Sequence, residues 1–266
     1  MAPPVIQAER LSRHFGDFKA VDEVSLDVSA GEILGLISPN GAGKSTLIKM
    51  LTTLLPPTSG TARIAGFDIV TQASDVRRHI GYVPQQLSAD GALTGHENLL
   101  LSARLYCVPA ALRADRISQA LDVMGLTDVA DHLVQRYSGG MIRRLEIAQS
   151  MIHRPAVLFL DEPTVGLDPV ARHTVWNHVR DLRKQFNTSM LMTTHYMDEV
   201  DVLCDRIALI DKGRIVSVGS PKALKDAVGP DATLDDVFAR LTRAESEAEG
   251  SYSNVRQARR SAHEHG

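Results

Sequence analysis

The sequence lacks several features that would place a protein in a class at once. It contains only two cysteines, Cys107 and Cys204, which lie far apart and form no C-x-x-C pair. We therefore expect two reduced thiols in a cytosolic protein and no disulfide framework. No stretch approaches the ~18 consecutive apolar residues of a membrane span, and the first ten residues lack the basic and apolar regions of a signal peptide. If the protein acts at a membrane, other chains must cross it.

Charge of one sign is also missing. The chain has 29 Lys and Arg residues against 32 Asp and Glu residues, a formal net charge of −3. This balance provides no bulk attraction to nucleic acid, so we expect no nucleic-acid partner. Hydrophobic residues make up 44% of the 266 residues, which suits one large or two small packed domains.

The sequence does have a glycine-rich loop between an apolar run and a helical pattern. Residues 33–37, "ILGLI", read as a buried strand, and Leu47, Ile48 and Leu51 recur at helical spacing. The loop "SPNGAGKST" matches the pattern G-x-x-x-x-G-K-[ST] except for a serine in the first position. Because Ser38 precedes a proline, its backbone is biased toward extended conformations, which tolerate a side chain. We therefore predict a nucleotide-binding loop, with these residues: Ser38, Pro39, Asn40, Gly41, Ala42, Gly43, Lys44, Ser45 and Thr46.

Such a loop points backbone N–H groups at phosphate oxygens and places a helix N-terminus behind them. Gly41 and Gly43 let the backbone turn and approach closely, and Lys44 would neutralise the β- and γ-phosphates. The hydroxyl group of Ser45 would bind Mg²⁺, so we expect a magnesium–nucleotide cofactor pair. An ordinary strand–turn–helix without a ligand is the alternative, and the intact Gly43-Lys44-Ser45 disfavours it.

Two acids follow a second apolar run. Residues 156–160, "AVLFL", predict a short buried strand that ends at Asp161 and Glu162. A carboxylate at this place can hold Mg²⁺ through water, the role we expect for Asp161. Glu162 is placed to act as the base on the attacking water. Two acids at a strand end can also be solvated surface, but the apolar run and the following proline favour catalysis.

Two further polar residues are candidates for the same site. Gln85, after "GYVP", could reach Mg²⁺ and the γ-phosphate, and His195, after "MLMTT", could hold the γ-phosphate or the water. Alone, the first could be a surface glutamine and the second a structural histidine. Their functional interpretation depends on the other motifs of the chain.

Residues 94–153 have a different character from the rest. Thr94 and Glu97 form a capping-box pattern, and a helical period runs from Met141 to Ile152. We predict a helical subdomain here, inserted into an α/β core. Residues 243–266 are polar and charged without apolar periodicity, and we expect them to be disordered.

The order of the motifs is specific. The chain reads "SPNGAGKST", "GYVPQ", "YSGGM", "VLFLDEP", "GLDP" and "TTH", and over residues 5–240 it resembles the ATP-binding cassette (ABC) family. The resemblance implies these roles: Ser38–Thr46 as P-loop, Gln85 as Q-loop, Tyr137–Met141 as signature, Asp161–Glu162 as Walker B, Asp168 as D-loop, His195 as switch histidine and Phe15 as the aromatic residue on adenine. It also implies the α/β fold of a P-loop ABC ATPase, with a RecA-like core, an N-terminal antiparallel β subdomain and the helical subdomain. Two subunits of this family enclose two ATP molecules.

The signature stretch has its own physical logic. Ser138 is a good N-cap, and Gly139 and Gly140 expose N–H groups at a positive helix end. Such an end can bind the γ-phosphate of ATP held by another subunit; a capped helix that binds nothing is the alternative. The family motif is L-S-G-G-Q, and here Tyr137 and Met141 replace the outer letters. Met141 removes an amide donor near the nucleotide.

Three short stretches resemble one branch of the family. "YSGGM", "LTGHENL" and "TLDDVFARLT" are similar to ATPase subunits of daunorubicin-resistance-type and related ABC-2 exporters. The resemblance implies transport-coupled ATP hydrolysis, a second copy of the chain or a homologous ATPase subunit, and separate transmembrane permease subunits. It places the protein at the cytoplasmic face of the cell membrane and suggests export of a drug-like or hydrophobic compound.

Two other functions compete with this one. A nucleotide-switched binding module without transport usually carries tandem cassettes or long coiled-coil insertions, whereas this sequence has one P-loop, one signature and no heptad run. A P-loop kinase needs an Arg-rich lid over a second substrate and leaves Ser138, Gly139 and Gly140 unexplained.

Overall fold

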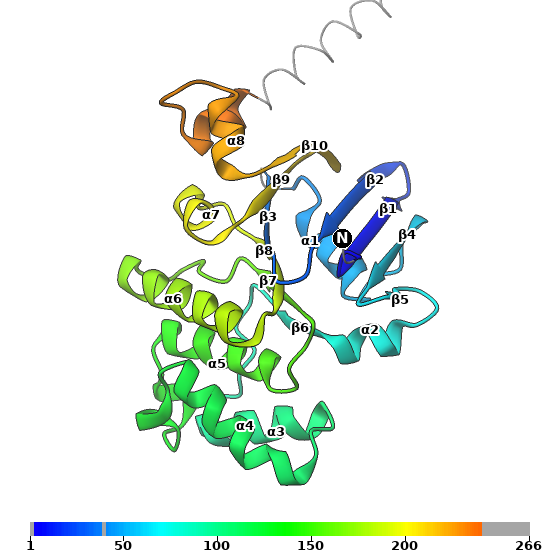
Figure 1. Cartoon of the computed structure of the whole chain (residues 1–266). Coiled ribbons are helices and arrows are strands. Elements are labelled where there is room, and N and C mark those ends of the chain that lie inside the picture. The colour runs from blue at the N-terminus through cyan, green and yellow to red at the C-terminus, as the bar shows by residue number, and fades with distance from the viewer. Residues whose placement is uncertain (1–2, 39–40, 241–266) are drawn as a thin grey trace, which may run out of the picture. The chain divides into compact units, whose positions relative to one another are not determined.

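The computed structural model describes residues 3–38 and 41–240 (Figure 1). The chain divides into two compact units, the first ending at Val218 and the second beginning at Gly219. In the second unit the described residues include helix α8 (Pro221–Asp226). Pro39, Asn40 and the tail expected to be disordered, 243–266, lie outside the described residues. Within the described ranges, no helix has the length and apolar character needed to span a bilayer.

A four-stranded antiparallel sheet forms the N-terminal part of the first unit. Its order is β2 (Phe18–Val28), β1 (Ile6–Phe15), β4 (Ser59–Ile64) and β5 (Phe67–Asp68). Val24, Leu26 and Val28 of β2 are buried and alternate with exposed residues, the pattern of a half-exposed strand. The pairing partner β1 was not predicted, because its mixed polar sequence has no clean alternation.

The second sheet has six strands, and several of the predicted motifs lie directly after its strands. Its order is β10 (Arg214–Gly219), β9 (Arg206–Asp211), β3 (Ile33–Ile37), β8 (Ser189–Thr193), β7 (Val157–Asp161) and β6 (Ile80–Val83). From β9 to β6 every neighbouring pair is parallel. Parallel strands end at the same edge of a sheet, so the segments after β3, β6, β7 and β8 meet there.

Each face of the parallel sheet has its own core. In β7, Val157 and Phe159 pack with the antiparallel sheet and α1 (Lys44–Leu51), whereas Leu158 and Leu160 pack with the inserted helices. Burial on both faces explains why this strand reads as a continuous apolar run in the sequence. The motif-bearing edge of the sheet is therefore supported by two packed cores.

The inserted helices form the predicted helical subdomain. They are α3 (Gly95–Leu105), α4 (Ala110–Val123) and α5 (Gly139–Met151), joined by 3-10 turns at Thr127–Val129 and Val134–Arg136. Thr94 and Glu97 make the complete capping box, and Ser138 caps α5. The α/β fold with antiparallel subdomain, parallel core and helical insertion is thereby confirmed.

The remaining helices of the first unit lie outside the insertion. They are α2 (Ala73–His79), α6 (Pro169–Phe186) and α7 (Met197–Leu203). Asp168 and Pro169 start α6 as N-cap and first helical residue. The two short helices α2 and α7 were not predicted, because seven residues give too little periodicity.

Candidate functional site

The glycine-rich loop lies between β3 and α1, with Lys44 as the first residue of the helix. The Lys44 side chain is buried, and its ammonium group donates hydrogen bonds to Ser38 Oγ at 2.8 Å and to the Ser38 carbonyl oxygen at 2.9 Å. Burial lowers the pKa of Lys44, and the charges of Glu162 and Asp161 partly offset that effect. The lysine predicted to bind phosphate is thus within the field of the two predicted acids.

The backbone of this loop favours glycine at two positions, and at one of them there is also no room for a side chain. Gly43 has φ +105°, and a Cβ atom there would lie 2.2 Å from the carbonyl oxygen of Ala20 in β2. At Gly41, φ is +83° and a Cβ atom would point into open space, on the exposed side of the loop. Ser45 is exposed one residue after Lys44. The glycine conformations at positions 41 and 43, the Lys44 cation and a nearby hydroxyl group fit the phosphates of a nucleotide.

A turn from the far end of the chain supports the same loop. The N–H of Gly213, between β9 and β10, donates to the Ala42 carbonyl at 3.0 Å, and the N–H of Asp22 donates to the Gly213 carbonyl at 2.8 Å. Arg214 donates to Asp22 Oδ2 at 2.6 and 2.9 Å, and Lys19 donates to Oδ1 at 3.3 Å. The bond to Arg214 is the main reason that the pKa of Asp22 is lowered. Sequence reasoning missed this support.

The two predicted acids lie at the end of β7 and are held by one threonine. Thr193, which ends β8, donates its hydroxyl to Asp161 Oδ1 at 2.6 Å. The N–H of Glu162 donates to Thr193 Oγ1 at 2.9 Å and to the Thr193 carbonyl at 3.1 Å. Glu162 has φ +48°, an unusual value for a residue with a side chain, and such strain occurs at functional sites. Thr193 is a second residue that sequence reasoning missed, although it directly precedes the "TH" of the switch motif.

Gln85 and His195 converge on Glu162. Gln85 Nε2 donates to Glu162 Oε2 at 3.2 Å, and His195 Nδ1 lies 3.5 Å from the same oxygen. These residues come from the segments after β6, β7 and β8, so the sheet edge brings them together. The geometry places two polar side chains of the correct type beside the predicted base.

A buried carboxylate lies behind these residues. Glu199 of α7 is fully buried, and its Oε1 accepts hydrogen bonds from Thr164 Oγ1 at 3.1 Å and Trp176 Nε1 at 2.9 Å. Burial raises the pKa of this carboxyl group. It connects α7 to the segment after Glu162 and to α6. No pattern in the sequence indicates this role, since the partners of Glu199 are 23 and 35 residues away.

The signature residues lie on the helical subdomain. Ser138 Oγ accepts from the Met141 N–H at 3.3 Å, and Gly139 is exposed beside it. At Gly140 a Cβ atom would lie 3.0 Å from Ala171 Cβ, so glycine permits the close approach of α6. The Tyr137 side chain is buried, and its hydroxyl donates to the Val129 carbonyl at 2.7 Å. A nucleotide contact of Tyr137 would therefore involve its backbone.

The two outlying candidates have local partners. Phe15 ends β1, is 48% exposed, and has the guanidinium group of Arg13 4.7 Å from its ring centre. The Asp168 carboxylate caps α6 by accepting from the N–H groups of Val170 and Ala171 at 2.9 and 3.0 Å. The structure thus gives Asp168 a capping role and leaves much of the Phe15 ring accessible.

The protein alone offers too few ligands for a magnesium ion, so the phosphates of a nucleotide would have to supply the others. Among the described residues, no group of three or more His, Cys, Asp or Glu side chains forms a metal site by itself. Mg²⁺ in nucleotide sites uses one or two protein ligands together with phosphates and water. The exposed Ser45 hydroxyl and the Asp161 carboxylate fit that smaller requirement.

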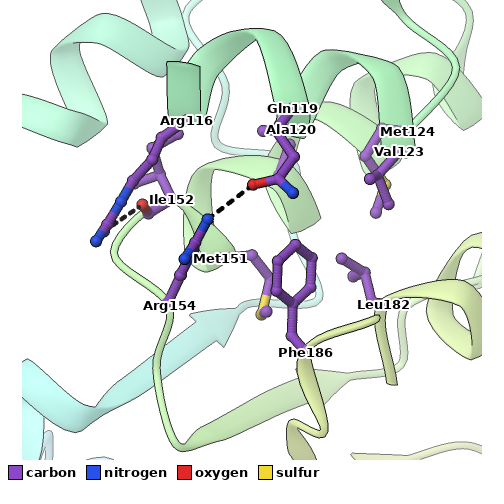
Figure 2. A pocket seen from close by; sticks show the side chains of 11 residues that line it. Arg116, Gln119, Ala120, Val123, Met124, Met151, Ile152, Arg154, Leu182 and Phe186 are labelled. Carbon is purple, nitrogen blue, oxygen red and sulfur yellow. Dashed lines mark hydrogen bonds between the residues drawn. The ribbon is translucent and has the colours of Figure 1, made fainter. Parts of the chain in front are cut away.

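A small pocket lies away from these residues, between α4, α5 and α6 (Figure 2). Its lining residues are Arg116, Gln119, Ala120, Val123, Met124, Ala148, Met151, Ile152, Arg154, Leu182 and Phe186. Arg116 donates to the Ile152 carbonyl at 3.1 Å, and Arg154 donates to Gln119 Oε1 at 2.9 Å. Both guanidinium groups donate hydrogen bonds to neighbouring parts of the chain, so we interpret this pocket as a gap in the packing between helices and not as a ligand site.

Comparisons with known proteins agree with this geometry. The ABC transporter family model matches residues 21–165, just over half of the chain. Daunorubicin/doxorubicin resistance ATP-binding protein DrrA of Streptomyces peucetius is 45% identical over 242 residues, which cover 91% of this chain and 73% of that protein. Doxorubicin resistance ATP-binding protein DrrA of Mycobacterium tuberculosis is 41% identical over 225 residues, 85% of this chain and 68% of that protein.

A solved structure has the same fold. CbiO1 from Clostridium perfringens, described as part of the ABC transporter complex cbiONQ, matches with a TM-score of 0.79 and 26% identity. The match covers 93% of this chain and 100% of that chain. The chain therefore belongs to the ABC transporter family, in which it is an ATP-binding subunit with ATPase activity.

Proposed function

We propose that this chain is the ATPase subunit of an ABC-2-type exporter for drug-like or hydrophobic compounds. It acts with a second copy of itself or a homologous ATPase subunit, and with separate permease subunits at the cytoplasmic face of the membrane. The drug-resistance names of the relatives support this substrate class. The observation that carries the proposal is that Gln85 and His195 both contact Glu162. The charge of the same Glu162 also acts on the ammonium group of Lys44.

The loop residues bind the nucleotide. The N–H groups at the start of α1 and the ammonium group of Lys44 bind the β- and γ-phosphates, which replace the contacts of Lys44 with Ser38. The exposed part of Phe15 stacks on the adenine ring. Ser45, Asp161 and Gln85 are the residues that would hold Mg²⁺, which would neutralise phosphate charge at this place.

Glu162 accepts the proton of the attacking water. The water oxygen forms a bond to the γ-phosphorus, the bond to the β–γ bridging oxygen breaks, and ADP leaves with that oxygen. Gln85 and His195, both at Glu162 Oε2, orient the carboxylate and the water. The Thr193 hydroxyl accepts from the backbone N–H of Glu162 and donates to the Asp161 carboxylate, so it holds both groups in place.

The N-terminus of α5 completes the site in the partner subunit. Ser138 and Gly139 are exposed at that helix end, where N–H groups and the helix dipole attract a γ-phosphate. Two ATP molecules would thus join two subunits, because each phosphate contacts both chains. Hydrolysis removes the shared phosphate and lets the dimer open.

Replacing the base tests the catalytic part of the proposal. Glu162→Gln keeps the size of the side chain and removes the proton acceptor, so we expect turnover to fall by about a hundredfold or more. ATP binding persists, and ATP shifts the variant to a dimer in light scattering. Glu9→Gln, at an exposed position of β1, is the matched control and keeps wild-type turnover. A wild-type rate for Glu162→Gln would show that another group is the base.

A second experiment tests the exporter assignment. The full chain is purified from detergent-solubilised membranes of its source cells, and the associated proteins are identified by mass spectrometry. We expect a membrane protein with about six apolar spans. Cells that carry both proteins should retain less doxorubicin than cells with Glu162→Gln. Recovery of the chain without any membrane partner would instead favour the nucleotide-switched binding module.

A further inference from the structure

Two fully buried charges lie on α5, beyond the signature residues. Arg143 and Glu146 are each 2% exposed, and Arg143 Nη1 lies 3.0 Å from Glu146 Oε2. They face the segment that follows β6. Burying two charges costs several kcal/mol per ion, and apolar residues of similar volume are often as stabilising. The charge–charge contact alone therefore does not explain why these two positions are ionic.

The pair holds that segment at both of its ends. Arg143 donates to the carbonyl oxygens of Pro84 and Gln85, each at 2.7 Å. Glu146 Oε1 accepts from the N–H and the hydroxyl of Ser88, the latter at 3.2 Å, and from the Ala89 N–H at 3.3 Å. The guanidinium group satisfies carbonyls at the start of the segment, and the carboxylate satisfies N–H groups at its end. Residues 84–89 are thus attached to α5 by both partners of one ion pair.

This attachment fixes Gln85 at its backbone while its side chain reaches the predicted base. The Gln85 carbonyl accepts from Arg143, and Gln85 Nε2 donates to Glu162 Oε2 at 3.2 Å. Ser138 begins the same helix five residues before Arg143. A continuous series of contacts therefore joins the N-terminus of α5 to Glu162.

We infer that Arg143 and Glu146 are positioning residues for Gln85, through which the placement of α5 sets Gln85 against Glu162. This inference rests on the proposed function, because it takes Glu162 as the base and Gln85 as its partner. Movement of α5 when its N-terminus binds a phosphate would move the backbone of Gln85 with it. The pair would then report engagement of the partner subunit to the hydrolytic site.

A mutant cycle in the full chain tests this inference. The double variant Arg143→Met/Glu146→Leu removes both charges together and leaves neither buried alone. We expect kcat for ATP hydrolysis to fall by about tenfold, with KM and the ATP dissociation constant changed by less than about threefold. The single variant Gln85→Ala should also lower kcat. In the Gln85→Ala background the double variant should cause no further loss, because the pair acts through that side chain.

The neighbouring arginine supplies a matched control. Arg144 also donates to carbonyl oxygens from α5, at 2.6 Å to Met124 and 3.1 Å to Gly125, but both acceptors lie within the helical subdomain. Arg144→Met should therefore leave the effect of Gln85→Ala on kcat unchanged. If the double variant does not fold, Arg143→Lys takes its place in the same cycle, since a lysine keeps the charge and reaches fewer carbonyls.

The possible outcomes distinguish the positioning role of the ion pair from the role of Gln85 in hydrolysis. Additive losses in the cycle would overturn the positioning role, because they would mean that the pair does not act through Gln85. A wild-type kcat for the double variant would overturn it as well. If Gln85→Ala itself leaves kcat unchanged, the assignment of Gln85 in the proposed function fails instead.

Discussion

The ammonium group of Lys44 donates hydrogen bonds to both oxygens of Ser38, at 2.8 Å to the hydroxyl and 2.9 Å to the carbonyl. In the sequence, Ser38 is a departure from the glycine expected at the start of the loop. The structure gives its side chain a specific partner, which is the same lysine that should bind phosphate. Ser38 therefore accepts two of the three ammonium protons, and its side-chain hydroxyl competes with the nucleotide for one of them.

The first prediction concerns this competition. Ser38→Gly removes the hydroxyl contact and keeps the carbonyl contact, so ATP binding should tighten, though by less than about fivefold. One hydrogen bond contributes about 1 kcal/mol net, and the added glycine flexibility offsets part of the gain. Titration with a fluorescent ATP analogue measures the dissociation constant, and Lys44→Ala, which should abolish productive binding, is the reference. Weaker binding by Ser38→Gly would mean that the hydroxyl pre-orients the lysine for phosphate.

The second prediction concerns the threonine between the two acids. Thr193→Val keeps the shape of the side chain but removes the donor to Asp161 and one of the two acceptors for the Glu162 N–H, leaving the Thr193 carbonyl as the other. Both groups are then less firmly held, and we expect kcat to fall by about tenfold, with a stability loss of about 1–3 kcal/mol from unsatisfied buried groups. Thr193→Ser keeps the hydroxyl and should retain most of the turnover. Equal losses in both variants would show that packing of the methyl group, rather than the hydroxyl, matters at this position.

The third prediction concerns the support of the loop by the turn between β9 and β10. Asp22→Ala removes the acceptor for Arg214 and Lys19, so the turn that carries Gly213 should hold the Ala42 carbonyl less firmly. We expect the ATP dissociation constant to rise by about three- to tenfold, as for the loss of one neutral hydrogen bond of about 1 kcal/mol, because the bond that contacts the loop is the neutral one from the Gly213 N–H.

Asp27 provides the matched control for that experiment. It lies on the same strand, β2, and contacts an arginine of β9, Arg206, at 3.1 Å. Because this contact is far from the loop along the strand, Asp27→Ala should leave the ATP dissociation constant unchanged. If both variants weaken ATP binding equally, general loosening of β2 is the cause and the specific support through Gly213 is wrong.

The sequence predicts the parts of the site that depend on local order along the chain. The strand that ends at Asp161, the loop before Lys44 and the caps Thr94, Ser138 and Asp168 all follow from patterns a few residues long. The α/β fold with its helical insertion follows from the alternation of such patterns, helped by the family resemblance.

The parts that could not be predicted depend on partners far away in the sequence. Arg214 is 192 residues from Asp22, and Arg143 is 58 residues from Gln85. No periodicity relates such residues, and either arginine could equally be a solvated surface charge. The contact of Lys44 with Ser38 is close in the sequence, but it depends on the direction of a side chain, which a motif does not specify.

The fourth prediction concerns pH and a histidine at the base of the helical subdomain. His153 stacks on the Tyr106 ring with centroids 3.8 Å apart, and its Nε2 donates to the Ile80 carbonyl at 3.0 Å. Its Nδ1 is buried and has no hydrogen-bond partner among the residues that the structure describes. Protonation would place an unsatisfied N–H at Nδ1, and burial accordingly lowers the pKa of His153 to about 4, with the charges of Arg116 and His79 adding to the effect.

The sign of the pH dependence follows from the two states. The unfolded chain binds a proton at this side chain below pH ~6.5, whereas the folded protein keeps it neutral down to about pH 4. The free energy of unfolding should therefore fall as the pH drops from 6.5 to 4, by up to about 3 kcal/mol from this group. Urea midpoints at pH 7.5 and 4.5 measure the effect. His153→Gln cannot bind that proton, so its midpoint should depend less on pH, while His96→Gln, at an exposed position, should behave as the wild type does. An unchanged pH dependence in His153→Gln would assign the acid sensitivity to other groups.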